Sequence, residues 1–265
     1  MRDPSPSARC GARFDGNRAE APARLDCYGC AMSFEQRLGR LDWQRLAGDL
    51  DRTGWATTGP LLTDEERRGL IDAYGDDSRF RSTIVMARHG YGRGEYRYFA
   101  YPLPSLVGAL REGLYARLLP IANRWREALG QGKPFPEDYA DFLAGCHSAG
   151  QKRPTPLMLR YGPGDYNCLH QDLYGDWVFP LQAAFLLTDP QEFEGGEFVL
   201  TEQRPRMQSR VEVVPLTAGE AVIFAVNQRP VRGARGTYRV AMRHGVSELR
   251  AGNRHTLGII MHDAA

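Results

Sequence analysis

In the first half of the chain, apolar residues recur at the spacing of a helix. Leu38, Leu41, Leu46 and Leu50 fall roughly on one face, and Gly54 follows soon after. This pattern predicts a helix that begins near residue 34 and ends before the glycine, because glycine is a common helix stop.

A second helix is marked by both of its ends. Thr63 and Glu66 have the spacing of a capping box, in which each side chain accepts a hydrogen bond from the backbone amide of the other residue. Leu70 and Tyr74 lie on one side, and Gly75 is a typical stop. Two more helices are predicted, at residues 105–129 and 137–144.

After Thr155 the helical period gives way to short apolar runs between turn residues. These runs are at 156–161, 178–187, 197–201, 211–214, 221–226, 238–242 and 256–261, with two earlier strands at 82–88 and 96–101. Several short strands at this spacing are typical of an antiparallel sandwich or barrel. We therefore predict an α+β fold, a double-stranded β-helix (jelly roll) with N-terminal supporting helices.

The same pattern suggests three parts. Residues 1–32 are rich in Pro, Ser, Gly, Arg and Ala and have no apolar period, which predicts a disordered tail. Residues 33–150 are predicted to form a helical support with a few strands, and residues 151–265 the β-helix core. Helix-like sequence begins directly after Met32, which would also fit a start of translation there.

Composition narrows the class of protein. The apolar share of 42% and the charged share of 25% are ordinary for a soluble globular chain of 265 residues. No run of 18 apolar residues occurs, so no membrane span or membrane partner is expected. The N-terminal residues lack the apolar segment of a secretory signal, and we expect a cytoplasmic protein. The oligomeric state is not predicted.

Basic residues are unevenly distributed. Only Lys133 and Lys152 are lysines, and the other 32 basic residues are arginines, for which a GC-rich coding sequence is the plain explanation. Eight arginines lie between Arg204 and Arg243 against two acidic residues. Because guanidinium groups bind phosphate through paired hydrogen bonds, this cluster would suit an anionic partner such as a nucleic acid. Its members are Arg204, Arg206, Arg210, Arg229, Arg232, Arg235, Arg239 and Arg243.

The cysteines do not form a regular framework. Five are present, an odd number, and in a cytosolic chain they are expected to be reduced. Cys27 and Cys30 form a single CxxC pair, but a structural zinc site needs four ligands and no second pair is near. A metal or redox role for this pair is therefore not expected.

His170 and Asp172 are the first candidates for chemistry. They are two residues apart, so on a strand both side chains would point to the same face, as two ligands of one metal must. A chance pair on a turn is the alternative. The preceding run, Arg160-Tyr161 and then Gly162-Pro163-Gly164, indicates a strand and a turn that lead to the start of the next strand.

Two candidates lie further along the chain. His244 follows Asp172 by 72 residues, and Arg254 follows the histidine by ten. If both lie on neighbouring strands of a small barrel, the arginine faces the interior. A buried guanidinium needs an anion, because an unpaired buried charge is costly. That anion is either a dicarboxylate ligand or a glutamate of the barrel itself.

Taken together, residues 157–262 resemble the 2-oxoglutarate- and Fe(II)-dependent oxygenase superfamily. The resemblance rests on Arg160-Tyr161-x-Pro-Gly, His170-Gln171-Asp172, Gly195-Gly196-Glu197-Phe198, His244-Gly245-Val246 and Arg254. It covers about 40% of the chain and is similar to two branches, the prolyl 4-hydroxylases and the alkyl-base demethylases of nucleic acids. The chain also looks like a bacterial group of such oxygenases proposed to modify nucleic acids.

The resemblance implies a role for each residue. His170, Asp172 and His244 would bind Fe(II), Arg254 would bind the far carboxylate of 2-oxoglutarate, and Tyr161 would help to hold that co-substrate. Fe(II), 2-oxoglutarate and O2 are the implied cofactors. The chain departs from the demethylases in one respect, since residues 255–262 lack their second arginine.

Four other histidines compete with these residues. His255 should face the opposite side of its strand from Arg254, and it is the replacement ligand if His244 is wrongly assigned. His262 and His89 are expected at the surface, and His147 in a loop.

Three functions remain open at this point. One is an oxygenase that hydroxylates or demethylates a nucleic acid, which the arginine cluster favours. Tyr91, Tyr96, Tyr98 and Tyr101 could then stack an extruded base, although alternating aromatics are more typical of a sheet core. The second is a peptidyl (prolyl-type) or small-molecule hydroxylase, which the single arginine favours. The third is a non-catalytic, metal-binding jelly-roll module.

Overall fold

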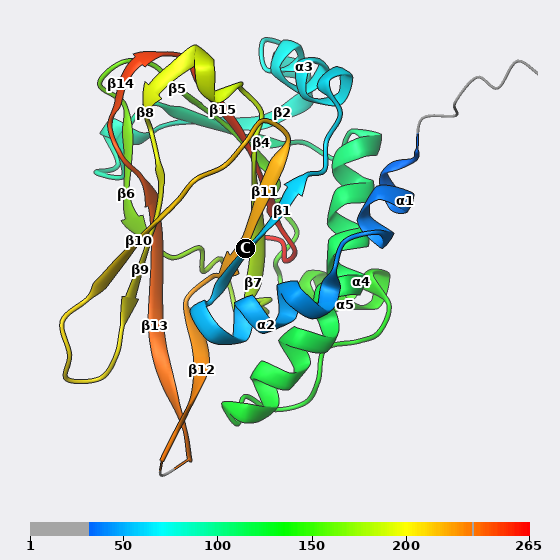
Figure 1. The fold of residues 1–265 in the computed structure, drawn as a ribbon. Coiled ribbons are helices and arrows are strands. Elements are labelled where there is room, and N and C mark those ends of the chain that lie inside the picture. The colour runs from blue at the N-terminus through cyan, green and yellow to red at the C-terminus, as the bar shows by residue number, and fades with distance from the viewer. Residues whose placement is uncertain (1–31, 235) are drawn as a thin grey trace, which may run out of the picture. The chain divides into compact units, whose positions relative to one another are not determined.

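Two antiparallel sheets form the centre of the protein (Figure 1). The computed structural model describes residues 32–234 and 236–265. The larger sheet has seven strands in the order β1 (Trp55–Pro60), β11 (Glu220–Ala225), β7 (Leu181–Leu186), β15 (Arg254–Ile260), β5 (Leu157–Tyr161), β4 (Glu95–Phe99) and β2 (Phe80–Val85).

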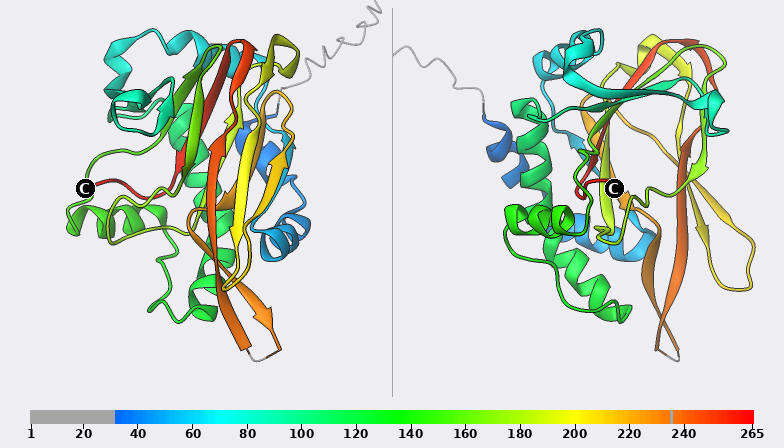
Figure 2. Two further views of the ribbon diagram at one scale, coloured as in Figure 1. Left: turned by 90° about the vertical axis from the view of Figure 1, so that its left-hand side faces the viewer. Right: turned by 180° about the vertical axis from the view of Figure 1, so that it is seen from behind.

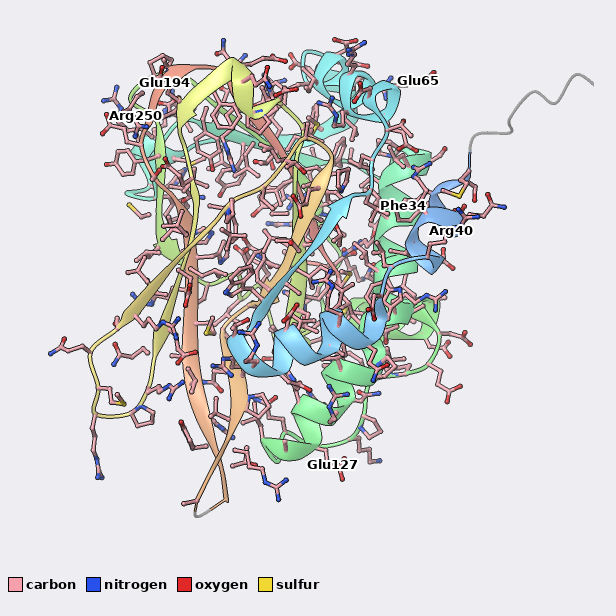
Figure 3. All side chains as sticks on the ribbon, viewed as in Figure 1. Phe34, Arg40, Glu65, Glu127, Glu194 and Arg250 are labelled. Carbon is pink, nitrogen blue, oxygen red and sulfur yellow. The ribbon has the colours of Figure 1, made fainter. Side chains whose placement is uncertain are left out.

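The smaller sheet faces the larger one. Its order is β10 (Arg210–Val214), β9 (Phe198–Gln203), β13 (Gly236–Val246), β6 (Tyr166–His170) and β3 (Gly92–Arg93), and β12 (Gln228–Gly233) pairs with β13. A separate two-stranded sheet joins β14 (Leu249–Gly252) to β8 (Phe193–Gly195). Figure 3 labels one residue of each of these two strands, Arg250 and Glu194, at the upper end of the molecule.

Eight of the strands are divided between the two sheets as a jelly roll requires. Along the chain, β5, β7, β11 and β15 enter the larger sheet, while β6, β9, β10 and β13 enter the smaller one. Their spatial orders are β5-β15-β7-β11 and β6-β13-β9-β10, so each strand of one half of the fold lies beside a strand of the other half. The predicted double-stranded β-helix is confirmed.

Helices cover the outer face of the larger sheet (Figures 1 and 2). Alternate residues of β7, such as Ala183 and Phe185, belong to one buried cluster with apolar residues of these helices, including Leu114 and Leu118. The remaining residues of the strand therefore face the space between the sheets. The helices are α1 (Phe34–Gly39), α2 (Trp43–Thr53), α3 (Asp64–Ala73), α4 (Ser105–Ala128) and α5 (Tyr139–Ser148), with short 3-10 turns η1 (Asp77–Arg79), η2 (Met86–Arg88) and η3 (Pro190–Glu192).

The first predicted helix is divided in two. Asp42 accepts a hydrogen bond from the Arg45 amide at 2.9 Å and so begins a new helix after α1. Helix α2 ends at Gly54, which has a left-handed φ of 83°. The capping box of α3 is confirmed, since the side chains of Thr63 and Glu66 each accept from the backbone amide of the other.

Five strands, β1, β3, β8, β12 and β14, were not predicted, because their partners in the fold determine them more than their own sequence does. Strand β12, Gln-Arg-Pro-Val-Arg-Gly, has no apolar alternation, yet it pairs with β13 along its whole length. Strand β1 pairs with β11 at the edge of the larger sheet, and β2 and β4 extend the other edge. Segments from the N-terminal half of the chain are therefore part of both sheets.

Some expectations concern residues outside the described part. The tail and the Cys27–Cys30 pair lie there, as does Arg235 of the arginine cluster. Within the described ranges, Cys146 is buried and Cys168 is exposed, and neither is in a disulfide. None of the helices in those ranges combines the length and the apolar character needed to cross a membrane.

Candidate active site

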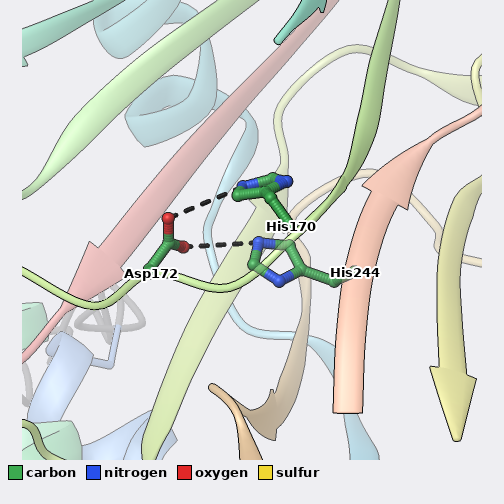
Figure 4. A group of neighbouring side chains, drawn as sticks. All are labelled: His170, Asp172 and His244. Atoms are coloured by element: carbon green, nitrogen blue, oxygen red, sulfur yellow. Dashed lines mark ion pairs between the residues drawn. The ribbon is translucent and has the colours of Figure 1, made fainter. Parts of the chain in front are cut away.

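His170, Asp172 and His244 lie together between the two sheets (Figure 4). His170 is the last residue of β6 and is paired in register with His244 on the neighbouring strand β13. Asp172 lies two residues beyond the end of β6, so the expectation that both ligands begin a strand is wrong. The side chains still converge, because the segment after β6 turns toward the interior.

Their contacting atoms define a small cluster. His170 Nε2 is 3.5 Å from Asp172 Oδ1, and His244 Nε2 is 3.3 Å from Asp172 Oδ2. One donor atom from each residue lies within 4.8 Å of the others. Two imidazole nitrogens and one carboxylate oxygen are the donor set of non-haem Fe(II) sites with open positions.

The carboxylate of Asp172 is held by two neutral donors. The Tyr174 hydroxyl donates to Oδ1 at 2.6 Å, and the Gln182 amide donates to Oδ2 at 2.7 Å. On the other side of the cluster, His170 Nδ1 is 2.8 Å from the Cys168 carbonyl oxygen. That carbonyl accepts a hydrogen bond from the Nδ1–H group and leaves Nε2 free to act as a ligand.

The electrostatic environment favours the metal-binding protonation states. Burial lowers the pKa of His170, and the neighbouring His244 lowers it further, so its imidazole is neutral near pH 7. Burial alone would raise the pKa of Asp172. The hydrogen bond and charge of His244, the charge of His170 and the Tyr174 hydroxyl together hold that pKa well below its usual range. A neutral imidazole and an ionised carboxylate are the forms that bind a metal.

Arg254 faces the same space from β15. It is 2% exposed, and its Nε and Nη1 atoms have no hydrogen-bond partner within the described residues. Burial lowers the pKa of Arg254 to about 10. No carboxylate forms an ion pair with it in the described part of the chain, which leaves a ligand as the remaining source of an anion.

A glycine is required at position 196, beside Arg254, for steric reasons. Gly196 has a φ of +63°, and a Cβ at this position would lie 2.9 Å from the Cδ of Arg254 and from Leu249 Cδ1. Only glycine tolerates both the backbone conformation and the close approach. Gly196 therefore leaves room for the arginine side chain.

Tyr161 and Thr256 complete this wall. Tyr161 is paired in register with Arg254 and is fully buried, and its hydroxyl lies near Asn167 without a well-formed hydrogen bond. Thr256 is two residues beyond Arg254, lines the same cavity and is 4% exposed. The Tyr161 hydroxyl and two nitrogens of the Arg254 guanidinium lack a partner, and with the Thr256 hydroxyl they make a polar pocket suited to a carboxylate.

One cavity of about 520 Å³ is lined by the His170, Asp172 and His244 trio together with Tyr161, Arg254 and Thr256. Its walls include the apolar side chains of Phe198 and Phe224. Three large residues of the lining are strongly exposed, and they mark its opening: Tyr91, Leu169 and Leu173. The cavity is large enough for a small dicarboxylate together with part of a substrate.

The tyrosines proposed for base stacking have different environments. Tyr91 and Tyr96 line the cavity, and Tyr91 is 50% exposed. Tyr98 is buried and its hydroxyl is 3.1 Å from that of Tyr174. Tyr101 donates a hydrogen bond to Asp263 and does not line the cavity. Only two of the four therefore reach the site.

Two predictions about the other histidines are wrong. His262 is fully buried instead of exposed, and His147 lies on α5 instead of in a loop, where its Nε2 is 2.9 Å from Asp263 Oδ2. His89 is exposed as expected. His255 faces away from the cavity and contacts the Tyr74 ring, so it does not replace His244.

The arginine cluster is only partly a free surface. Arg229 is 1% exposed and forms an ion pair with Glu202, which also pairs with Arg204. Arg210 pairs with Glu212. Four cluster members are exposed and have no carboxylate partner in the described residues: Arg206, Arg232, Arg239 and Arg243. The β9–β10 loop and the β12–β13 hairpin carry most of the cluster and project from the same end of the molecule (Figures 1 and 2).

Sequence reasoning missed Tyr174, Gln182 and Thr256. For Gln182 a signal exists, because it is the one polar residue in the otherwise apolar strand Leu-Gln-Ala-Ala-Phe-Leu. Thr256 could be found from its spacing, since two residues along a strand bring it to the same face as Arg254. Tyr174 follows the ligands in an irregular segment and has no comparable signal.

Residues 94–264 match the family Oxygenase-NA, described as an oxygenase catalysing oxidative methylation of damaged DNA. The chain is also similar to two uncharacterised proteins of Mycobacterium tuberculosis, from strains CDC 1551 and H37Rv. Each is 43% identical over 238 residues, which is 88% of this chain and 100% of the relative.

Among solved structures, the chain is similar to two bacterial oxygenases. A prolyl-4-hydroxylase of Pseudomonas putida has a TM-score of 0.49 at 16% identity, over 82% of this chain and 96% of that one. An oxidoreductase of the 2OG-Fe(II) oxygenase family from Burkholderia pseudomallei has the same TM-score and identity, over 84% and 92%.

Proposed function

Because the chain belongs to the Oxygenase-NA family of 2-oxoglutarate- and Fe(II)-dependent oxygenases, we propose that it oxidises a C–H bond of a nucleic acid. A methyl group on a damaged DNA base is the substrate that the family description favours. Hydroxylation of an N-methyl group leads to its loss as formaldehyde, so hydroxylation and demethylation differ only in the atom that carries the methyl group.

The residues of the cavity fit the cofactors. His170, Asp172 and His244 would hold Fe(II), and the lowered pKa values of His170 and Asp172 suit a metal. The Arg254 guanidinium, two of whose nitrogens lack a partner, would bind the far carboxylate of 2-oxoglutarate, with Tyr161 and Thr256 beside it. When bound, the iron and 2-oxoglutarate would activate O2, with one oxygen atom going to succinate, CO2 released, and the other oxygen atom inserted into the substrate C–H bond.

The protein's own contribution is binding and orientation. The apolar walls at Phe198 and Phe224 exclude water from the reacting groups, and the opening between Tyr91, Leu169 and Leu173 admits only part of a large substrate. A planar base extruded from a nucleic acid strand fits such an opening, because tyrosine and leucine side chains stack or pack against its faces.

The exposed arginines supply the electrostatic part of the proposal. Arg206, Arg232, Arg239 and Arg243 have no carboxylate partner in the described residues and could bind phosphates, although Arg239 also donates a hydrogen bond to the Leu129 carbonyl. Each phosphate contact releases counterions, so binding should weaken steeply with salt. The observation that carries the proposal is the match of residues 94–264 to a family of DNA oxygenases, with the ligand trio inside it.

Succinate release provides the test. The enzyme with Fe(II), 2-oxoglutarate and O2 is offered single-stranded DNA that carries N-methylated bases, unmethylated DNA of the same sequence, or a proline-rich peptide. We expect succinate and formaldehyde in equal amounts from the methylated DNA alone. Succinate from the peptide alone would favour a peptidyl hydroxylase, and DNA would then be the wrong substrate class.

A charge-reversal pair tests the surface. Replacing both Arg232 and Arg243 by glutamate should weaken binding of single-stranded DNA by roughly 10-fold or more. The slope of log affinity against log salt concentration should also fall, by the amount expected for the loss of about two phosphate contacts. Arg52→Glu, which alters an exposed arginine of α2 paired with Asp49, is the matched control and should change little. Equal DNA affinity in both variants would exclude the cluster as the binding surface.

A further inference from the structure

Gln182 is an unusual residue for its strand. Strand β7 lies near the middle of the larger sheet between β11 and β15, and its other residues are all apolar. Gln182 is 4% exposed, pairs with Phe224 on one side and Ile260 on the other, and lines the cavity. Burial of an amide costs folding free energy unless its polar atoms are hydrogen bonded, so the contacts of Gln182 indicate its role.

The amide contacts two of the three candidate ligands. Its Nε2 donates to Asp172 Oδ2 at 2.7 Å and lies 3.4 Å from His244 Nε2. A carboxylate only accepts hydrogen bonds, so the nitrogen of the amide, and not its oxygen, must face Asp172. This fixes the orientation of the side chain.

The other half of the amide is unsatisfied. Gln182 Oε1 is buried and has no hydrogen-bond partner in the described residues. An unpaired buried acceptor costs about 1–3 kcal/mol, so a methionine of similar shape would make a more stable strand. Stability alone therefore does not account for a glutamine at this position, whereas its contact with Asp172 does.

Tyr174 makes the complementary contact. Its hydroxyl donates to Asp172 Oδ1 at 2.6 Å, while Gln182 donates to Oδ2. The two donors come from different segments, the loop after β6 and the strand β7. Held at both oxygens, the carboxylate plane cannot rotate about χ2, and one oxygen stays directed toward each histidine (Figure 4).

We infer that Gln182 is a positioning residue, which with Tyr174 fixes the Asp172 carboxylate in the orientation that binds the metal. Groups that hold a metal ligand through a hydrogen bond typically change metal affinity by roughly 10- to 100-fold when removed. This inference rests on the proposed function, because it requires that the trio binds a divalent metal. It assigns a role to a residue that would not itself contact iron.

Metal affinity is the direct measurement. Co(II) is titrated into the intact metal-free protein, with the dissociation constant taken from calorimetry and the ligand geometry from the visible absorption of bound Co(II). Gln182→Met should weaken Co(II) binding roughly 10- to 100-fold and alter the absorption band. The metal-free variant should melt at the same temperature as wild type or higher, because an unpaired buried oxygen is removed.

Gln151→Met is the matched control. Gln151 is also a buried glutamine, with hydrogen bonds to the Trp177 and Asp263 backbones, and it does not line the cavity. Its replacement should lower the melting temperature and leave the Co(II) affinity unchanged. Tyr174→Phe, which removes the donor to Oδ1, should weaken Co(II) binding like Gln182→Met.

The outcomes separate this inference from the proposed function. If wild type binds Co(II) and both Gln182→Met and Tyr174→Phe bind it equally well, the positioning role is wrong. If Gln182→Met lowers only the melting temperature, as Gln151→Met should, Gln182 is structural. If wild type itself binds no divalent metal, the proposed function fails first.

Discussion

At the scale of single residues, the site consists of groups that would be unfavourable in a protein without ligands. Arg254 is buried and lacks a partner for two of its nitrogens, and the Tyr161 hydroxyl and Gln182 Oε1 are also unpaired. Such groups reduce stability and are retained where they bind something. Their concentration around one cavity is the strongest structural sign of function in this molecule.

Substitution of Arg254 should separate binding from stability. Arg254→Met removes a desolvated charge, so the ligand-free protein should be more stable. The same change should weaken 2-oxoglutarate binding by roughly 10- to 100-fold, because a hydrogen bond to a charged group contributes about 1.5–3 kcal/mol. Thermal unfolding and anaerobic calorimetry check the two effects. Unchanged 2-oxoglutarate affinity would show that the co-substrate is held elsewhere.

The candidate trio of metal ligands was predictable from residue type and spacing, whereas the residues that would support it depend on tertiary packing. Residue type and spacing identified His170, Asp172 and His244, which the structure brings together. The same spacing argument placed Asp172 on a strand, and it lies beyond one. Gln182 and Tyr174 are ordinary residues until the fold brings them to Asp172.

At the scale of elements, the backbone conformation of the Gly195-Gly196 turn affects the pocket proposed for 2-oxoglutarate. Gly196→Ala should destabilise the protein by about 1–3 kcal/mol through its positive φ, and should also displace Arg254 and weaken 2-oxoglutarate binding. Gly130→Ala is matched to it, since Gly130 has a φ of +62° and no atom within 4 Å of a Cβ. Unfolding midpoints and 2-oxoglutarate affinity are measured for both variants. Equal 2-oxoglutarate affinity in the two variants would show that the close approach to Arg254 is unimportant.

The order and type of most elements followed from local sequence, but some boundaries did not. Helix α3 carries its own capping box and was predicted closely. Strand β12 has a charged, proline-containing sequence and forms only because β13 lies beside it. The break between α1 and α2 depends on Asp42, which caps the start of α2. This role is recognisable in the sequence only once Gly39 is taken as the end of the preceding helix.

At the scale of the whole molecule, one buried ion pair joins the C-terminal segment to the longest helix. Arg111 of α4 is 2.6 Å from Asp263, and both side chains are buried. Arg111→Met leaves the buried Asp263 carboxylate with only the Tyr101 hydroxyl and His147 as side-chain partners, and should cost about 3–5 kcal/mol in denaturant unfolding. Arg79→Met, which breaks an exposed pair with Asp76, should cost at most about 1 kcal/mol. Similar losses in the two variants would contradict this account.

The buried histidines make stability depend on pH. Burial lowers the pKa of His262 to about 4, and burial also lowers the pKa of His255 to about 4. Both bind a proton near pH 6.5 when unfolded, so the unfolded state gains protons first as the pH falls. Stability should therefore decrease from about pH 6.5 to pH 4, by up to about 1.4 kcal/mol per unit for the fully buried His262.

Unfolding midpoints between pH 7 and pH 4 measure this effect. His262→Gln keeps an acceptor for the Phe179 amide, which now donates to His262 Nδ1, and should flatten the profile. If the stability of His262→Gln depends on pH as steeply as that of wild type, His262 does not cause the pH dependence of stability.

The central claim is that this cavity binds a divalent metal at the trio and 2-oxoglutarate beside it. Anaerobic calorimetry of 2-oxoglutarate with the wild-type protein and with Asp172→Ala, each with and without Fe(II), tests it most directly. We predict tight, Fe(II)-dependent binding to wild type and no Fe(II)-dependent gain in the variant. If wild type binds neither Fe(II) nor 2-oxoglutarate, or if Asp172→Ala binds both equally well, the claim is contradicted.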